Sequence, residues 1–375
     1  MDFSVTCLVH STRIRHMRTI QQATQSYESW VSAHCRIHAD DLRAKHRGMA
    51  SDLFPFLRAT FYRWAELFQH HLPELARSPR VLGVGDPHIE NFGTWRDTEG
   101  RLVWGINDFD EACPLPYTND LVRLAASAWI AGEEDQLSLG SNAACRSILQ
   151  GFRESLESGG RPFVLSENNR WLREAVTSRL RDPARFWGKL VLLRTEKNVP
   201  REVLLLLAES MPVEARRGFR IVHRQAGLGS LGRSRFTALA EWQGGWIARE
   251  AKSLLPSVWG FPQDECADEE VFYQRIVKAA VRSPDPFVAV HPSWLLRRLS
   301  PYCSRIELRD LPRKRDEARL LYAMGWELAN VHLGTPRAGA RLTEDLRGRE
   351  SRWLTKAAEL MVEATRDDWR AWRDR

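Results

Sequence analysis

The sequence predicts an α+β protein in which helical segments enclose a smaller β-rich segment. Helical periodicity dominates residues 119–215, whereas residues 216–310 contain short alternating runs separated by glycine-rich turns. Amphipathic helical patterns return at 316–334 and 351–373. This order predicts a mostly helical large lobe and a small antiparallel β lobe.

The N-terminal part is expected to hold two helices followed by short strands. Apolar spacing over 18–50 predicts a surface helix, and the run at 54–72 predicts a more buried one. A short strand at 81–85 runs into the polar stretch DPHIENFG, and a TEG turn precedes a second strand at 102–106. Residues 107–118 predict an acidic loop with two prolines.

The β-rich part is expected to be a set of short strands. FRIVHRQ reads as a strand, and RFTALAEW and WIAREAK read as two strands around a turn at 243–245. A helix over 267–283 and two further short strands, FVAVH and WLLRRLS, complete this part. We therefore expect a helical lobe over 1–215, a β-rich lobe over 216–310, and helices over 311–375 that return to the helical lobe.

The composition excludes several classes of protein. The 375 residues contain no apolar run of about 18 residues, so no membrane-spanning helix is predicted. Six scattered cysteines without a CxxC pair predict reduced thiols and a cytoplasmic protein. The formal charge of +7 permits anionic ligands, but no recognition motif for nucleic acid is present. The sequence does not predict an oligomeric state.

A first group of polar residues follows the predicted strands in the N-terminal half. Asp86 and Asn91 lie in VGDPHIENFG, and Asp108 follows LVWGIN. At the ends of paired strands these side chains would converge, and carboxylate and amide oxygens suit Mg²⁺. The spacing is that of kinase-type phosphoryl transfer, in which one Asp orients the attacking hydroxyl. The alternative is that each residue only caps a turn.

Neighbouring residues have supporting roles in this hypothesis. His88 lacks a second, suitably spaced His for a metal site, so we expect it to position the loop. Asp110 and Glu111 are either additional metal neighbours or solvated acids, and the second interpretation is favoured.

A second group lies in the β-rich part. AGLGSLG contains Gly227, Gly229, Ser230 and Gly232, and such a loop can bring backbone N–H groups close to phosphate oxygens. Lys252 ends a strand one hairpin later, where a kinase carries its phosphate-binding lysine. The alternatives are a simple hairpin turn and a solvated lysine. Glu269 and Glu270 are the candidate acidic partners of Lys252.

Two motifs give the chain a family resemblance. GDPHIENFG followed by GINDFDEACP resembles the paired motifs of aminoglycoside-phosphotransferase-like and other protein-kinase-like enzymes. More closely, VGDPHIENFG, INDFDEACPLPYTNDLVRLAAS and PFLRAT resemble a bacterial family known as domain of unknown function 2252. The resemblance implies that Asp86 is the catalytic base and that Asn91 and Asp108 are metal ligands. It also implies that Asp120 braces the catalytic loop, which is the segment that carries Asp86 and Asn91.

The order of the motifs departs from that of ordinary kinases. Here Asp86, Asn91 and Asp108 precede the glycine-rich loop and Lys252, so we expect a circularly permuted, bilobal kinase-like fold. The helix ending GWELANVH would then lead from the β lobe back to the catalytic loop. An accidental glycine motif, or a site unrelated to kinases, would also account for the order.

The expected function is that of an Mg²⁺- and ATP-dependent phosphotransferase acting on a hydroxyl group of a small molecule. The same residues could instead transfer AMP, or the chain could bind a nucleotide without catalysis. The sequence does not identify the acceptor.

Overall fold

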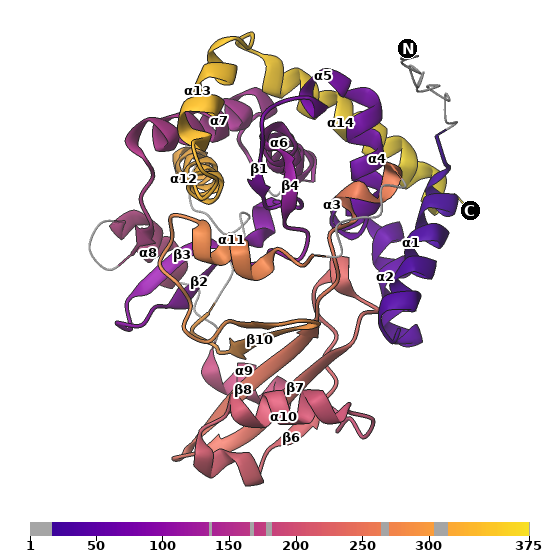
Figure 1. Cartoon of the computed structure of the whole chain (residues 1–375), viewed down its shortest axis with the longest axis vertical. Helices are drawn as coiled ribbons and strands as arrows, with labels where there is room; N and C mark the ends of the chain where they lie inside the picture. The colour runs from indigo at the N-terminus through magenta and orange to yellow at the C-terminus, as the bar shows by residue number, and fades with distance from the viewer. Residues whose placement is uncertain are drawn as a thin grey trace, which may run out of the picture.

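The computed structural model describes residues 17–134, 137–165, 169–177, 182–263, 270–303 and 314–374. Helices gather in one part of the molecule, and the largest sheet lies at the opposite end (Figure 1). The prediction of an α+β protein is confirmed. Four described cysteines, Cys35, Cys113, Cys145 and Cys303, are free thiols.

The helical part contains most of the helices and two small sheets. Its helices are α1 (Ile20–His34), α2 (Ala39–Ser51), α3 (Leu53–Ala59), α4 (Phe61–His71), α5 (Pro73–Ala76), α6 (Tyr117–Glu133), α7 (Ser141–Ser158), α8 (Arg170–Thr177), α12 (Lys314–His332), α13 (Ala338–Arg347) and α14 (Trp353–Arg373). Its strands are β1 (Arg80–Gly83), β2 (Phe92–Arg96), β3 (Leu102–Ile106), β4 (Cys113–Pro116) and β5 (Phe163–Val164). The predicted helices over 18–50 and 54–72 are each split in two, and α13 was not predicted.

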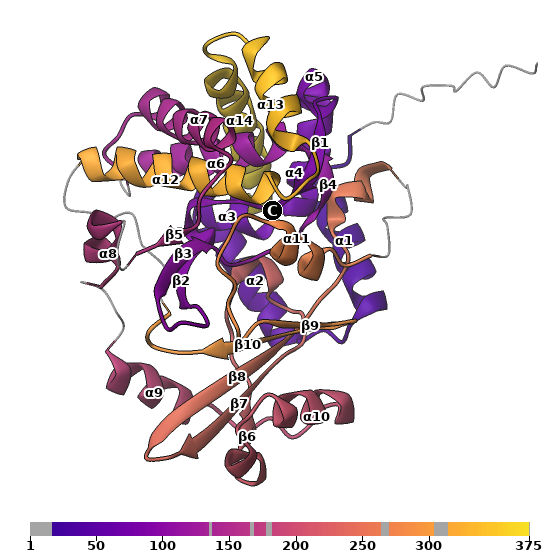
Figure 2. The same ribbon diagram turned by 60° about the vertical axis from the view of Figure 1, so that its left-hand side comes forward.

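Helix α6 forms the centre of the helical part, and α7 and α12 pack beside it (Figure 2). Contact between α7 and α12 is made at the backbone. A Cβ atom added at Gly151 would lie 1.9 Å from the carbonyl oxygen of Tyr322, and one added at Gly325 would lie 2.0 Å from that of Ile148. These glycines therefore allow the two helices to approach closely. No described helix combines the length and hydropathy needed to cross a membrane.

The β lobe is built on a five-stranded antiparallel sheet with the strand order β6-β7-β8-β10-β9. Its strands are β6 (Arg220–Val222), β7 (Arg235–Trp242), β8 (Gly245–Ser253), β9 (Ala289–His291) and β10 (Trp294–Leu299), and α11 (Tyr273–Ala279) lies between β8 and β9 in the chain. The turn between β7 and β8 has left-handed backbone at Gln243 and Gly244. Lys252 lies on the central strand β8, opposite Arg235 and Leu295.

The domain boundary at residue 215 is wrong for two helices. The helices α9 (Pro183–Val191) and α10 (Arg201–Glu209) were expected in the helical lobe. Instead, Leu190 packs against Leu239 of the sheet, and Val203 and Leu207 share a core with strands of the same sheet. Figure 2 shows both helices beside β6, β7 and β8. An apolar helix face predicts burial, but it does not specify which partner covers it.

The strands that lead to the polar residues are not paired as expected. β1 pairs with β4, whereas β2 pairs with β3 in a separate three-stranded sheet with β5. Asp86 and Asp108 therefore follow strands of two different sheets. Their convergence depends on the loops and on α6, because no common sheet edge holds them together.

Candidate active site

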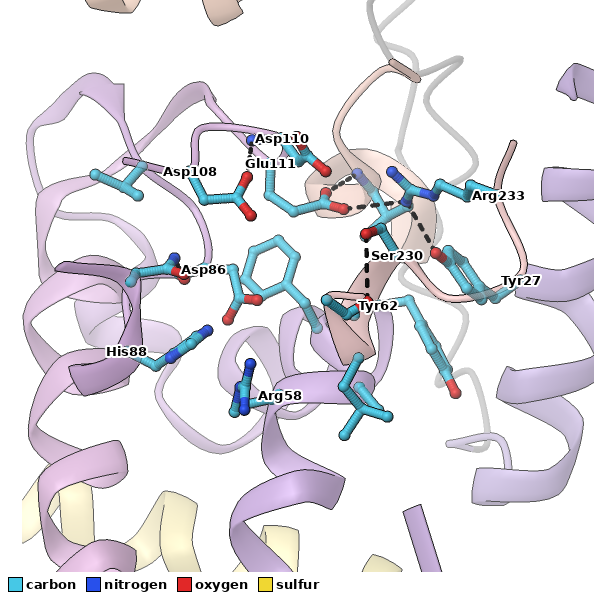
Figure 3. Close-up of a pocket in the computed structure, with 18 residues that line it drawn as sticks. Tyr27, Arg58, Tyr62, Asp86, His88, Asp108, Asp110, Glu111, Ser230 and Arg233 are labelled. Carbon is cyan, nitrogen blue, oxygen red and sulfur yellow. Dashed lines mark hydrogen bonds and ion pairs between the residues drawn. The ribbon is translucent and has the colours of Figure 1, made fainter. Parts of the chain in front are cut away.

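The two predicted groups of residues meet in one small pocket of about 60 Å³ (Figure 3). Asp86, Asn91 and Asp108 line it from the helical part, and Gly227, Leu228, Gly229 and Ser230 line it from the loop between β6 and β7. Asp86 and Asp108 extend their carboxylates into the same space, and Glu111 and Arg233 lie farther along it (Figure 3). The structure thus brings together residues that are more than 100 positions apart in the chain.

Asp86 is held by a buried arginine. Nη2 of Arg123, on α6, lies 2.7 Å from Oδ1 of Asp86, and the same arginine donates to the carbonyl oxygen of Leu57. The side chain of Asp86 is 18% exposed, so one side of the carboxylate faces the pocket. Burial raises the pKa of Asp86 to about 6, although Arg123 opposes this shift. Its carboxylate is therefore ionised at neutral pH and can accept a proton.

Asp120 fixes the backbone that leads into Asp86. Its carboxylate accepts hydrogen bonds from the N–H groups of Val84, at 2.7 Å, and Gly85, at 3.0 Å. The carboxylate also lies 2.8 Å from Nε2 of His332, the last residue of α12. Asp120 therefore ties the loop, α6 and α12 together, which is the geometry expected of a bracing residue.

Asn91 and Asp108 are brought together by the β2–β3 hairpin. Phe92 pairs with Ile106, and the N–H of Asn107 donates to the carbonyl oxygen of Asn91. The side-chain amide of Asn91 donates to the backbone carbonyl of Asp86 at 2.7 Å, which orients its NH₂ group and leaves its amide oxygen as a potential ligand.

His88 shapes the turn between Asp86 and Asn91. Its Nδ1 accepts a hydrogen bond from the N–H of Glu90 at 3.2 Å, as a cap of the short turn Ile89–Asn91. The ring is buried and packs edge-on against Phe54. These contacts are those of a residue that positions the loop.

Lys252 reaches the same site from β8. Its ammonium group pairs with Asp110 and lies 3.5 Å from Oδ2 of Asp108. The side chain is 3% exposed, so the interpretation as a solvated lysine is wrong. Glu270 is not its partner, because Glu270 is exposed and lies 3.9 Å from Arg275. Glu269 lies outside the described residues.

Asp110 and Glu111 are largely buried, so their interpretation as solvated acids is wrong. Their side chains are 11% and 12% exposed. Burial raises the pKa of Glu111 to about 7, although this carboxylate faces Arg233 and accepts the N–H of Val258. Burial and the neighbouring Asp108 also raise the pKa of Asp110. The loop folds inward because Lys252 and Arg233 lie against it.

The residues present fit a bound Mg²⁺ ion. Oδ1 of Asp110 is buried without a hydrogen-bond partner among the described residues, and it lies beside Asp108 and Lys252. Among the described residues no cluster of three or more His, Cys, Asp or Glu side chains is arranged to hold a metal. Asn91 and Asp108 would provide only two protein ligands, and Mg²⁺ accepts such a site because it keeps waters and phosphate oxygens in its shell.

The glycine-rich loop is pinned to the helical part. Leu228 packs onto α2 at Gly48, and Nζ of Lys45 donates to the carbonyl oxygen of Gly229 at 3.0 Å. Gly227 has a φ angle of 74°, which glycine adopts without strain. Gly232 does not line the pocket; its carbonyl oxygen accepts the N–H of His38.

The site also contains cationic residues that the sequence did not single out. Arg123 holds Asp86, Arg58 pairs with Glu90, and Arg233 lies between Tyr27 and Glu111. Lys45 is fully buried against the rings of Tyr27 and Tyr62. In the sequence, each of these residues is marked only as a charged residue within an apolar helical or strand pattern, and such residues are more often solvated.

The burial of Lys45 should make the free energy of unfolding depend on pH, and a substitution at this position should remove that dependence. Burial lowers the pKa of Lys45 from 10.5 to about 7. Below about pH 10.5 the unfolded chain binds a proton that the folded protein does not take up until about pH 7. Wild-type stability therefore falls as pH falls through this window. Lys45→Met should gain stability relative to wild type by about 1.4 kcal/mol per pH unit from pH 10 to 7.

Urea unfolding of both proteins at several pH values measures this difference. Lys356→Met is the matched control, because Lys356 is 61% exposed and should show no such trend. A difference between Lys45→Met and wild type that is constant with pH would contradict the assignment.

The fold and the site define an α+β protein with a polar pocket between a helical part and a β lobe. Residues 36–185 match the family described as uncharacterized protein conserved in bacteria (DUF2252). The matched stretch contains Asp86, Asn91, Asp108 and Asp120, and it ends before Gly227; it supports the family part of the resemblance. The comparison with curated proteins gave no match, and the comparison with solved structures gave none either.

Proposed function

We propose that the chain is an Mg²⁺- and ATP-dependent phosphotransferase with a circularly permuted, kinase-like fold, and that its acceptor is a hydroxyl group of a small molecule. The observation that carries this proposal is the meeting of Asp86, Asn91 and Asp108 with the Gly227–Ser230 loop in one pocket, with Lys252 at its edge. A carboxylate base, oxygen ligands for a metal and a phosphate-binding loop with a lysine are the parts that phosphoryl transfer requires.

The permutation is supported by the connections between the two parts. The glycine-rich loop joins β6 and β7, and Lys252 lies on the next strand, β8, as in a kinase nucleotide lobe. After β10 the chain enters α12, whose last residue His332 contacts Asp120 beside the catalytic loop. Residues far along the chain thereby lead back to Asp86.

Each residue has a role that follows from its position. Backbone N–H groups of the loop would bind phosphate oxygens, and Lys252 would neutralise their charge. Asn91 and Asp108 would hold Mg²⁺, which supplies positive charge to the phosphate oxygens when bound. Asp86 would take the proton of the acceptor hydroxyl. The acceptor oxygen then bonds to the γ-phosphorus, the bond between this phosphorus and the β–γ bridging oxygen breaks, and ADP leaves.

The test is a screen of small hydroxyl compounds with Mg-ATP, in which ADP and pyrophosphate are measured separately. We expect Mg-ATP to bind the protein alone and ADP to be released when an acceptor is present. Release of pyrophosphate would instead show AMP transfer. Absence of Mg-ATP binding by calorimetry would overturn the proposed function.

A further inference from the structure

A larger cavity of about 420 Å³ lies beside the candidate active site, and Gly227 lines both. Its walls come from the β2–β3 hairpin, from α11 and from the end of β10. It therefore lies between the helical part and the β lobe, next to Asp108. A group bound in this cavity would be within reach of a reaction at the smaller pocket.

Basic side chains dominate the charged lining of this cavity. Arg224, Arg282, Arg297 and Arg298 face only two carboxylates, those of Glu90 and Asp285. Glu90 is already paired with Arg58. The lining thus has an excess of two positive charges before any buried partner is considered.

Two of the four arginines are held from behind by one shared carboxylate. Arg224 and Arg297 both pair with the fully buried carboxylate of Glu250, at 2.7 Å and 2.6 Å. A third arginine, Arg235, pairs with the same carboxylate but does not line the cavity. Arg224 and Arg297 are therefore rigid parts of the wall. Because Glu250 supplies one negative charge against three arginines, it does not remove the positive excess, and Arg282 and Arg298 form no ion pair within the described structure.

Arg282 has no hydrogen-bond partner among the described residues. Its Nε and Nη1 atoms are buried, and its guanidinium lies between the rings of Trp95, at 4.6 Å, and Phe109, at 5.0 Å. Glu327 and Asp285 lie close enough to act on it electrostatically but form no ion pair with it within the described structure. A guanidinium held by rings, with its donors unused, is ready to bind an oxyanion.

Arg298 lines the same cavity from β10. Its guanidinium stacks over Phe287 at 3.9 Å, and its Nε is also buried without a hydrogen-bond partner among the described residues. Phosphate carries between one and two negative charges near pH 7 and offers several acceptor oxygens. This charge matches the excess in the cavity better than one carboxylate does.

We propose that the cavity lined by Arg282 and Arg298 is an anion site that takes a phosphate group of a substrate. The inference rests on the proposed function, because it assigns the second half of the same site. The phosphate has two possible sources. One is the nucleotide, bound with its terminal phosphates in the cavity, and the other is a phosphorylated acceptor.

The first source would replace the proposed γ-phosphoryl transfer by AMP transfer at the same site. The acceptor oxygen would bond to the α-phosphorus, and the bond between this phosphorus and the α–β bridging oxygen would break. Pyrophosphate would leave into the arginine cavity, and Asp86 would take the hydroxyl proton. The second source is compatible with transfer of the γ-phosphoryl group and release of ADP.

Calorimetric titration of inorganic pyrophosphate, with EDTA present to remove metal ions, tests the site. We expect wild type to bind, and Arg282→Gln and Arg298→Gln to bind at least tenfold more weakly. Arg275→Gln is the matched control, because Arg275 is 67% exposed and does not line the cavity. If Arg282→Gln fails to fold, Arg298→Gln tests the site alone, since Arg298 stacks on a single ring, Phe287, that is 36% exposed.

The remaining outcomes separate the two sources from failure. If Arg298→Gln loses both pyrophosphate binding and Mg-ATP binding, the cavity is assigned to the nucleotide. If Arg298→Gln still binds Mg-ATP, and wild type binds pyrophosphate and Mg-ATP at the same time, the cavity is assigned to the acceptor. Absence of pyrophosphate binding by wild type, or equal binding by wild type and both variants, overturns the anion site. Failure of the proposed function is distinct, since it appears as wild type that does not bind Mg-ATP.

Discussion

Asp86→Asn is expected to lower kcat by about 10²–10⁴-fold while leaving the Kd of Mg-ATP within about threefold of wild type. The amide keeps the shape of the carboxylate but cannot accept the proton of the acceptor hydroxyl. Asp86 pairs with Arg123, whereas Lys252 pairs with Asp110 and lies beside Asp108, so nucleotide binding should be little affected. Steady-state kinetics and calorimetry on the same preparation measure both quantities.

The buried arginine makes folding a necessary control for this variant. Removing the charge of Asp86 leaves Arg123 without its carboxylate, and breaking a buried ion pair in this way costs about 3–5 kcal/mol. Asp86→Glu keeps the charge but displaces the oxygens, so it should be inactive yet more stable than Asp86→Asn. Asp367→Asn, at a 73% exposed position of α14, should behave as wild type. Wild-type turnover by Asp86→Asn would exclude Asp86 as the base.

Asp108→Ala is expected to weaken Mg-ATP binding by at least tenfold and to abolish the dependence of nucleotide binding on Mg²⁺. Among the carboxylates that line the pocket, Asp108 is the most exposed, at 28%. It is therefore the one best placed to reach a metal ion held by phosphate oxygens. Removing it also leaves Lys252 paired with Asp110 alone. Calorimetric titration of ATP with Mg²⁺ and with EDTA measures the effect.

Two results would distinguish a metal ligand from a structural residue. If Asp108 only holds Lys252 in place, ATP binding should weaken equally with Mg²⁺ and with EDTA. Asp367→Ala is the matched surface control. If Mg²⁺ strengthens ATP binding by Asp108→Ala as much as it does for wild type, Asp108 is not a metal ligand.

Local patterns were sufficient for most of the elements and for the residues that carry the candidate chemistry. The hairpin formed by β7 and β8 follows from alternation around a glycine turn, and α12 and α14 follow from helical periodicity. Asp86, Asn91 and Asp108 stood out because two carboxylates and an amide near the ends of predicted strands have the spacing of kinase-type phosphoryl transfer. Such features depend on neighbours in the chain, which the sequence contains.

Tertiary structure decided which residues became partners. Lys252 pairs with Asp110 instead of an acid near 269–270, and Asp110 is buried instead of solvated, because the β lobe closes over its loop. Lys45 and Arg123 support the site from helices whose periodicity gave no sign of it. Whether a charged side chain faces water or a partner depends on segments far away in the chain. Periodicity records only that a face is buried and not what covers it, which is also why α9 and α10 were assigned to the wrong lobe.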